Sequence, residues 1–196
     1  MNVNKIFHDF SVNFTDSGEL FLPSQIQNVS TDAYHRSGVM AMKKPNYLRW
    51  ILSVETVGIL SAILSRNGTQ VYGETILKPA LSPPAVPFPV VWTILYALMG
   101  IGAARIAAAP DSRARSLALN VFVMQLIVNF FWSLIFFNAQ AFGFAFFWLL
   151  LLWVLIGGML FLFYRVDKAA ALLQIPYFLW VTFAAYLNYG VWQLNK

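Results

Sequence analysis

The sequence contains no cysteine and little charge. Without cysteine the chain cannot form disulfides, present a thiolate nucleophile or bind zinc through sulfur. Only 11% of its 196 residues are charged and 59% are hydrophobic, whereas about a quarter of a soluble domain is charged. The two histidines, His8 and His35, both lie in the polar N-terminal stretch. The apolar part therefore has no imidazole for metal binding or acid–base chemistry, and we expect no metal site.

A chain of this composition cannot hide its apolar surface from water, so we expect lipid to surround most of it. A membrane-spanning helix needs about 20 mostly apolar residues. The sequence supplies five such segments, at residues 47–64, 89–109, 117–137, 142–163 and 169–194. The predicted fold is all-α, a polytopic bundle of five transmembrane helices. The short link between the third and fourth segments predicts antiparallel neighbours, and residues 66–88 form the longest connection.

The cations that flank the predicted spans lie mostly on one side. On the N-terminal side they are Lys43, Lys44, Arg49, Arg105, Arg113, Arg115, Arg165 and Lys168. The opposite side has only Arg66, Lys78 and Lys196. The positive-inside rule then predicts an integral protein of a bacterial cell membrane with a cytoplasmic N-terminus. The net charge of +5 reflects this bias, and no basic run indicates a nucleic-acid partner.

Residues 1–46 differ from the rest, because they are polar and show no sustained periodicity. One interpretation is a flexible cytoplasmic extension ahead of a membrane domain at residues 47–196. Another is that translation starts at Met40 or Met42, since a start followed by two lysines and an apolar run is common in membrane proteins. A cleaved signal peptide is disfavoured, because Glu55 falls in the would-be apolar region.

Three helical faces combine aromatic side chains with polar or small ones. They are Trp92, Tyr96, Met99 and Gly100; Gln125, Asn129, Trp132 and Ser133; and Tyr177, Trp180, Ala184 and Asn188. An unpaired amide in hydrocarbon is costly, so Gln125 and Asn129 must face the bundle interior. They could join helices through hydrogen bonds or line a ligand pocket. Trp50, Trp148 and Trp192 fit an interfacial belt or lipid-facing packing and receive no function.

Three other features of the spans bear on function or packing. Glu55 is a functional candidate because acids within spans are costly; alternatively, a late or tilted first helix leaves it facing a polar interior. Arg105 is predicted to extend from the end of its helix to the interface. Gly100, Ala104 and Ala108 form a small-residue stripe that permits close contact between helices, or a dimer.

Residues 78–100 read KPALSPPAVPFPVVWTILYALMG, a proline-rich collar that leads into an apolar helix. Each proline fixes φ and removes a backbone donor, which stiffens the collar. This stretch resembles the signature of the TspO/MBR family, the translocator proteins and tryptophan-rich sensory proteins. Residues 125–137 resemble the family pattern QxxxNxxWSxxFF, and residues 176–188 resemble PYxxWxxFAxYLN. The resemblance covers residues 49–195.

The resemblance implies a five-helix bundle, commonly a homodimer, with a porphyrin pocket beneath the first loop. Its ligands would be tetrapyrroles such as protoporphyrin IX and haem, with no further cofactor required. The pocket positions carried over are Tyr72, Trp92, Tyr96, Gln125, Asn129, Trp132, Tyr177, Trp180 and Asn188. Trp92 and Trp180 match tryptophans linked in some bacterial members to light-dependent porphyrin breakdown.

Three functions remain open: a receptor or sensor for tetrapyrroles, a light-dependent porphyrin-degrading enzyme using Trp92 and Trp180, and a transporter of tetrapyrroles or other amphiphiles. The receptor is preferred, because the sequence offers no acid–base pair or cofactor motif for conventional catalysis. Val71 and Val86 depart from family aromatics, and Tyr72 lies one residue farther than usual from the Lys-Pro pair. Sterol binding is not expected, because the C-terminal sterol motif lacks its cation, Lys196 coming one position too late.

Overall fold

The first of two compact units contains a short pair of strands. The computed structural model describes residues 13–14, 20–21, 43–82 and 87–196. The chain divides into the units Met1–Ala41 and Met42–Lys196. In the first unit, β1 (Asn13–Phe14) pairs antiparallel with β2 (Leu20–Phe21). The alternative starts Met40 and Met42 lie outside the described residues, so the start site and the flexible extension stay predictions.

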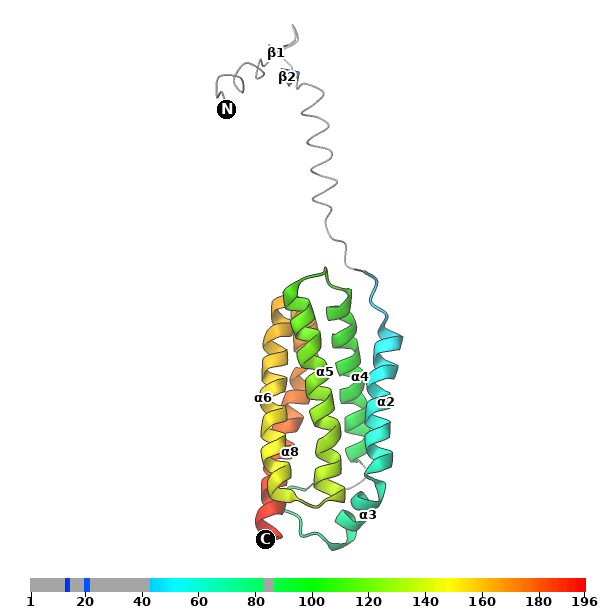
Figure 1. Ribbon diagram of the computed structural model, residues 1–196, viewed down its shortest axis with the longest axis vertical. Helices are drawn as coiled ribbons and strands as arrows, with labels where there is room; N and C mark the ends of the chain where they lie inside the picture. The colour runs from blue at the N-terminus through cyan, green and yellow to red at the C-terminus, as the bar shows by residue number, and fades with distance from the viewer. Residues whose placement is uncertain (1–12, 15–19, 22–42, 83–86) are drawn as a thin grey trace, which may run out of the picture. The chain divides into compact units, whose positions relative to one another are not determined.

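The second unit is a bundle of five membrane-spanning segments, as predicted. They are α2 (Tyr47–Leu64), α4 (Pro87–Ala108), α5 (Arg113–Ser133) continued by the π-helix η2 (Leu134–Asn138), α6 (Phe142–Val166), and α7 (Lys168–Leu172) followed by α8 (Ile175–Leu194). The predicted first span agrees with α2 at both ends. Figure 1 shows α2, α4, α5 and α6 running side by side along one axis. The protein is therefore an integral membrane protein.

Side chains satisfy the free ends of several helices. At the start of α2, Asn46 Oδ1 accepts a hydrogen bond from the Arg49 backbone N–H at 3.1 Å. At the start of α7, Asp167 Oδ1 accepts from two backbone N–H groups at 2.9 and 3.3 Å. Such caps provide partners for N–H groups that have none within the helix. Pro176 lies in the first turn of α8, where its missing N–H leaves no bond unmade.

A tight connection joins α5 to α6. The π-helix η2 ends at Asn138 and α6 begins at Phe142. Between them, Gln140 adopts a φ of 48°, a left-handed conformation that is uncommon outside glycine. The two helices pack against each other, which confirms the predicted antiparallel pair.

The small-residue stripe of α4 is buried inside this one chain. A Cβ atom added to Gly100 would lie 2.6 Å from the Ile51 Cα atom, so α2 and α4 approach closely there. Ala104 and Ala108 are also buried. The predicted close helix contact is confirmed, whereas a dimer through this stripe would need a surface that the chain already covers. A homodimer through another face stays a prediction.

The connection predicted at residues 66–88 contains a helix that sequence analysis missed, α3 (Arg66–Thr75). This helix is short and polar and has no buried residue, so it lacks the long apolar run that indicates a membrane-spanning helix. It packs on η2, where a Cβ atom at Gly68 would collide with the Phe137 carbonyl. Tyr72 therefore lies on a helix and not in a loop. Pro83 and Pro84 of the predicted collar lie outside the described residues.

Arg105 forms an ion pair, which differs from the predicted extension to the interface. Its Nη2 atom lies 2.8 Å from Asp167 Oδ2, and only 32% and 11% of the two side chains are exposed. Asp167 also caps α7, so the pair joins the end of α4 to the start of α7. The ion pair forms because the α6–α7 connection brings a carboxylate beside Arg105, which no local pattern indicates.

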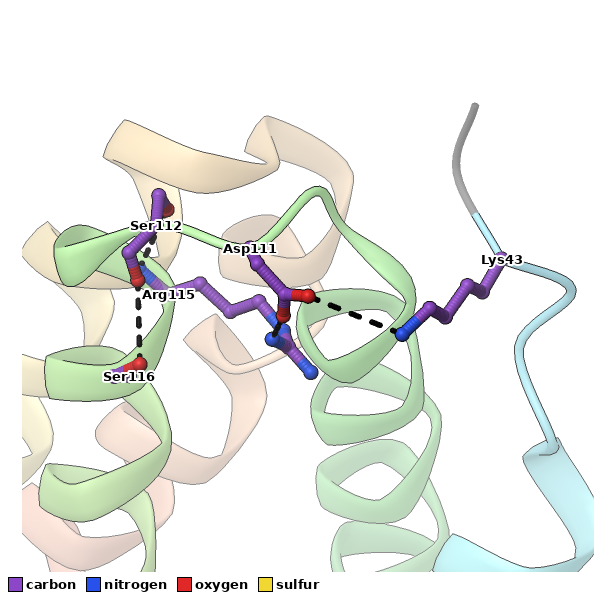
Figure 2. A network of polar contacts seen from close by, with 5 residues as sticks. All are labelled: Lys43, Asp111, Ser112, Arg115 and Ser116. Atoms are coloured by element: carbon purple, nitrogen blue, oxygen red, sulfur yellow. Dashed lines mark hydrogen bonds and ion pairs between the residues drawn. The ribbon is translucent and has the colours of Figure 1, made fainter. Parts of the chain in front are cut away.

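A second polar network links the start of the membrane unit to the α4–α5 connection (Figure 2). The Asp111 carboxylate contacts Lys43 Nζ at 3.9 Å and also pairs with Arg115 Nη1. Ser112 caps α5, since its Oγ accepts from the Arg115 backbone N–H at 3.1 Å. Ser116 Oγ donates to the Ser112 carbonyl at 3.2 Å. Exposed pairs of this kind contribute about 0–1 kcal/mol each.

Candidate functional site

A cavity of about 450 Å³ lies between α2, α3, α4 and α5. Its aromatic wall is formed by Trp92 and Tyr96 of α4 together with Trp132 of α5 and Phe137 of η2. The facing wall comes from α2 and is mostly small or polar. The volume falls within the range of about 300–1,000 Å³ typical of small-molecule sites.

The cavity has a deep end and a mouth. Along α2 and α3 its lining runs from Glu55 to Thr69, and along α4 from Tyr96 back to Phe88. The lining residues of α2 and α4 run in opposite chain directions. Glu55 of α2 and Tyr96 of α4 therefore both lie at the deep end of the cavity, within the membrane-spanning segments. Arg66 and Phe88 lie at the mouth, beside α3.

Gly58 allows the Tyr96 ring to lie directly against α2. A Cβ atom at this position would be only 2.5 Å from Tyr96 Cδ2, closer than carbon atoms pack. Tyr96 is 8% exposed, so its ring is enclosed between the two helices. The glycine therefore sets the shape of the deep end.

A second cavity of about 200 Å³ adjoins the first near the mouth. It is lined by Tyr72 and Lys78 from the first connection and by Asn188 of α8, among others. Trp132 and Phe137 line both cavities. The two spaces are thus separated by shared aromatic side chains and not by a helix.

A row of aromatic rings connects α4 to α8. The ring centroids of Trp92 and Tyr96 are 5.4 Å apart, and those of Trp92 and Phe88 are 6.2 Å apart. Phe88 in turn lies 5.8 Å from Trp180. These spacings are typical of favourable aromatic pairs. Trp180 lines neither cavity, and its buried Nε1 has no hydrogen-bond partner among the described residues.

Gln125 and Tyr177 form a fully buried hydrogen bond between α5 and α8. The Tyr177 hydroxyl donates to Gln125 Oε1 at 2.9 Å, and neither residue is exposed to solvent. Gln125 Nε2 also lies 3.9 Å from Met99 Sδ. The prediction that Gln125 and Asn129 face the bundle interior is confirmed, and for Gln125 the contact joins helices.

Asn188 holds the Trp132 indole in place. Its Oδ1 accepts from Trp132 Nε1 at 3.2 Å, and its Nδ2 donates to the Phe142 carbonyl at 2.9 Å. Asn129 is 2% exposed and lies beside the Tyr96 hydroxyl, so it supports the aromatic wall of the larger cavity from behind.

The nine predicted site residues divide into two groups. Five line the cavities: Tyr72, Trp92, Tyr96, Trp132 and Asn188. The other four lie behind this lining: Gln125, Asn129, Tyr177 and Trp180. Sequence analysis missed Arg66, Lys78 and Phe88 as lining residues. Arg66 and Lys78 stand out in the sequence as cations on the less basic side of the membrane. This feature could have indicated a site, but it was used only to predict topology.

The segment after α3 is held to the end of α8. The Leu77 backbone N–H donates to Asn195 Oδ1 at 3.0 Å, and Asn195 Nδ2 donates to the Leu77 carbonyl at 2.9 Å.

Tyr72 packs on Phe136 and Phe137 with centroid distances of 5.3 and 5.4 Å. Burial raises the pKa of the Tyr72 phenol above its ordinary value, so the hydroxyl stays protonated at neutral pH.

The part of the chain that the structure describes contains no cluster of three or more His, Asp or Glu side chains that could hold a metal ion. Its cavities instead combine aromatic faces, the amide of Asn188 and, at the mouth, two cations. Such lining suits a large, flat, apolar ligand with acidic groups at its edge.

Comparison with known proteins identifies the family. The model of the TspO/MBR family matches residues 50–193. The tryptophan-rich protein TspO of Chlorobaculum tepidum is 36% identical over 71% of this chain and 89% of its own length. Protein CrtK of Rhodobacter capsulatus is 38% identical over 74% and 90%, and the tryptophan-rich sensory protein of Cereibacter sphaeroides is 32% identical over 62% and 75%. The chain therefore belongs to the TspO/MBR family.

Proposed function

We propose that the protein is a membrane receptor that binds tetrapyrroles such as protoporphyrin IX in the two adjoining cavities. Binding would regulate porphyrin handling or a stress response. The observation that carries this proposal is a cavity of about 450 Å³ whose wall contains Trp92, Tyr96 and Trp132. Indole and phenol faces suit a flat macrocycle, because aromatic pairs add to the gain from burial. The name of the Cereibacter sphaeroides relative, a sensory protein, is consistent with this role.

Two cations at the mouth support a ligand with acidic side chains. Arg66 lines the larger cavity and Lys78 the smaller one, and neither belongs to an ion pair within residues 43–82 and 87–196. A porphyrin bound with its ring between the aromatic walls would direct its two propionates toward these cations. Charge-assisted hydrogen bonds of this kind are stronger than neutral ones.

The test is a titration of the purified protein, in lipid nanodiscs, with protoporphyrin IX in the dark. We expect saturable binding that Trp92→Phe weakens, because the indole faces the cavity. Trp180→Phe should have a smaller effect, because Trp180 lies behind Phe88. Trp153→Phe is the matched control, since Trp153 lies on α6 away from both cavities and donates to Thr182 Oγ1 at 2.9 Å.

Two results would count against the receptor. Binding that does not saturate, or that Trp92→Phe and Trp153→Phe affect equally, would mean that the porphyrin only partitions into lipid. Illumination of the saturated complex separates the receptor from an enzyme. A new pigment that requires Trp92 would favour light-dependent degradation over simple binding.

A further inference from the structure

Glu55 lies in the middle of a membrane-spanning helix, far from either surface. α2 has 18 residues, Tyr47–Leu64, so about 12 Å of helix extends on each side of Glu55. A glutamate side chain cannot reach the interface across that distance. Glu55 is only partly exposed and lines the deep end of the larger cavity.

No other side chain in the described ranges offsets this carboxyl group. Within residues 43–82 and 87–196 it takes part in no ion pair and no hydrogen bond. Arg66, the cation that shares its cavity, lies eleven residues later, about 16 Å along the helical chain. On the facing helix, Thr93 Oγ1 already donates to the Pro89 carbonyl at 3.1 Å, and the Tyr96 hydroxyl, which lies near Glu55 at the deep end, forms no hydrogen bond with it within the described residues.

The surroundings of Glu55 favour a cation. An acid within a span is costly unless it is paired, so such residues commonly mark a ligand or ion site. The rings of Trp92 and Tyr96 line the same space, and aromatic faces attract cations within about 6 Å. A carboxylate and two aromatic rings in an apolar cavity are complementary to a positively charged nitrogen on an apolar body.

We propose that Glu55 makes the deep end of the larger cavity a binding site for hydrophobic amines, apolar ring compounds that carry one protonated nitrogen. The ammonium group pairs with the Glu55 carboxylate, and the rings pack on Trp92 and Tyr96. This site uses the deep end alone, whereas tetrapyrrole binding as proposed above also uses Arg66 and Lys78 at the mouth. The two ligands overlap at Trp92 and therefore compete.

The test compares two probes of the same shape, 2-(1-naphthyl)ethylamine and 2-(1-naphthyl)ethanol, by calorimetry on protein in phosphatidylcholine nanodiscs. We expect the wild-type protein to bind the amine roughly 10-fold or more tightly than the alcohol, as a charge-assisted bond implies. Glu55→Gln should abolish this preference and Glu55→Asp should keep part of it. Glu74→Gln is the matched control, because exposed Glu74 lies on α3 outside both cavities.

Comparing variants in the same lipid cancels partition of the amine into the bilayer. Equal affinity of the wild-type protein for the two probes would overturn the proposal, and so would an amine preference that survives Glu55→Gln. A protoporphyrin IX titration of the same samples keeps the two proposals separate. Loss of amine preference with porphyrin binding retained supports the amine site, whereas amine preference without porphyrin binding refutes only the tetrapyrrole receptor.

Discussion

Replacing Gly58 with alanine should displace the Tyr96 ring and weaken ligand binding. The added Cβ atom would lie 2.5 Å from Tyr96 Cδ2, whereas carbon atoms pack at about 3.5–4.0 Å. The ring must therefore move by about 1 Å or more. Because Tyr96 is enclosed between α2 and α4, it can move only into the cavity or by separating the two helices.

The energetic consequence follows from this crowding. Overpacking of a well-filled site costs about 1–3 kcal/mol, and the better helix propensity of alanine offsets up to about 1 kcal/mol of that loss in the free protein. If the same crowding opposes the ligand, protoporphyrin IX should bind about 5-fold or more weakly. Gly58→Ala should lower the thermal unfolding temperature only slightly.

The assay is the porphyrin titration, run beside thermal unfolding followed by circular dichroism. Gly158→Ala is the control, because a Cβ atom at Gly158 on α6 meets nothing within 4 Å. That variant should bind porphyrin like the wild-type protein and be no less stable. An unchanged affinity in Gly58→Ala would refute the reasoning, since it would mean that the deep end does not contact the ligand.

Three further predictions concern polar contacts between elements of the bundle. Tyr177→Phe should destabilise the protein by about 1–3 kcal/mol in detergent unfolding, because it leaves Gln125 Oε1 unpaired, yet it should leave porphyrin affinity nearly unchanged. Asp167→Ala should lower the unfolding temperature, because it removes both the α7 cap and the partner of Arg105. Asn195→Ala should speed amide hydrogen exchange in the segment that follows α3, because its two hydrogen bonds to that backbone are lost.

Each of these predictions has a clear contrary result. A large loss of porphyrin affinity in Tyr177→Phe would show that the buried pair contacts the ligand after all. For Asp167→Ala the comparison is Lys43→Ala, which removes an exposed ion pair and should change the free energy of unfolding by no more than about 1 kcal/mol. An equal loss of stability in the two variants would contradict the expectation that the Arg105–Asp167 pair contributes more than the exposed Lys43–Asp111 pair. Unaltered exchange in Asn195→Ala would mean that other contacts hold the segment.

The sequence predicted the spans well because lipid imposes a simple rule. A segment that crosses hydrocarbon must be long and apolar, and an amide within it must turn inward. Both rules apply residue by residue, which is why the ends of α2 and the burial of Gln125 and Asn129 agree with prediction. Helix α3 obeys neither rule. It is short and polar and depends on packing against η2. In the sequence alone, a glycine such as Gly68 therefore indicates a loop.

The sequence could not predict which of the aromatic and polar residues line the cavities and which lie behind the lining. Helical spacing places Tyr177 and Trp180 on one face of α8, yet neither lines a cavity, because Trp92 and Phe88 of α4 lie in between. The π-helix adds a further difference, since it changes the angular spacing after Ser133. These outcomes depend on how helices approach one another, and a single helix does not encode that.

The position of α2 at the edge of the bundle has a consequence for how a ligand arrives. Only Val54 and Ser61 of this helix are buried, and the helix packs mainly on α4. The opposite cavity wall, in contrast, consists of helices with buried aromatic cores. The contact of α2 with α5, which also lines the larger cavity, is much less extensive, and regions with few contacts open at the lowest free energy. A hydrophobic molecule dissolved in the bilayer would thus enter sideways, between α2 and α5, without first crossing water.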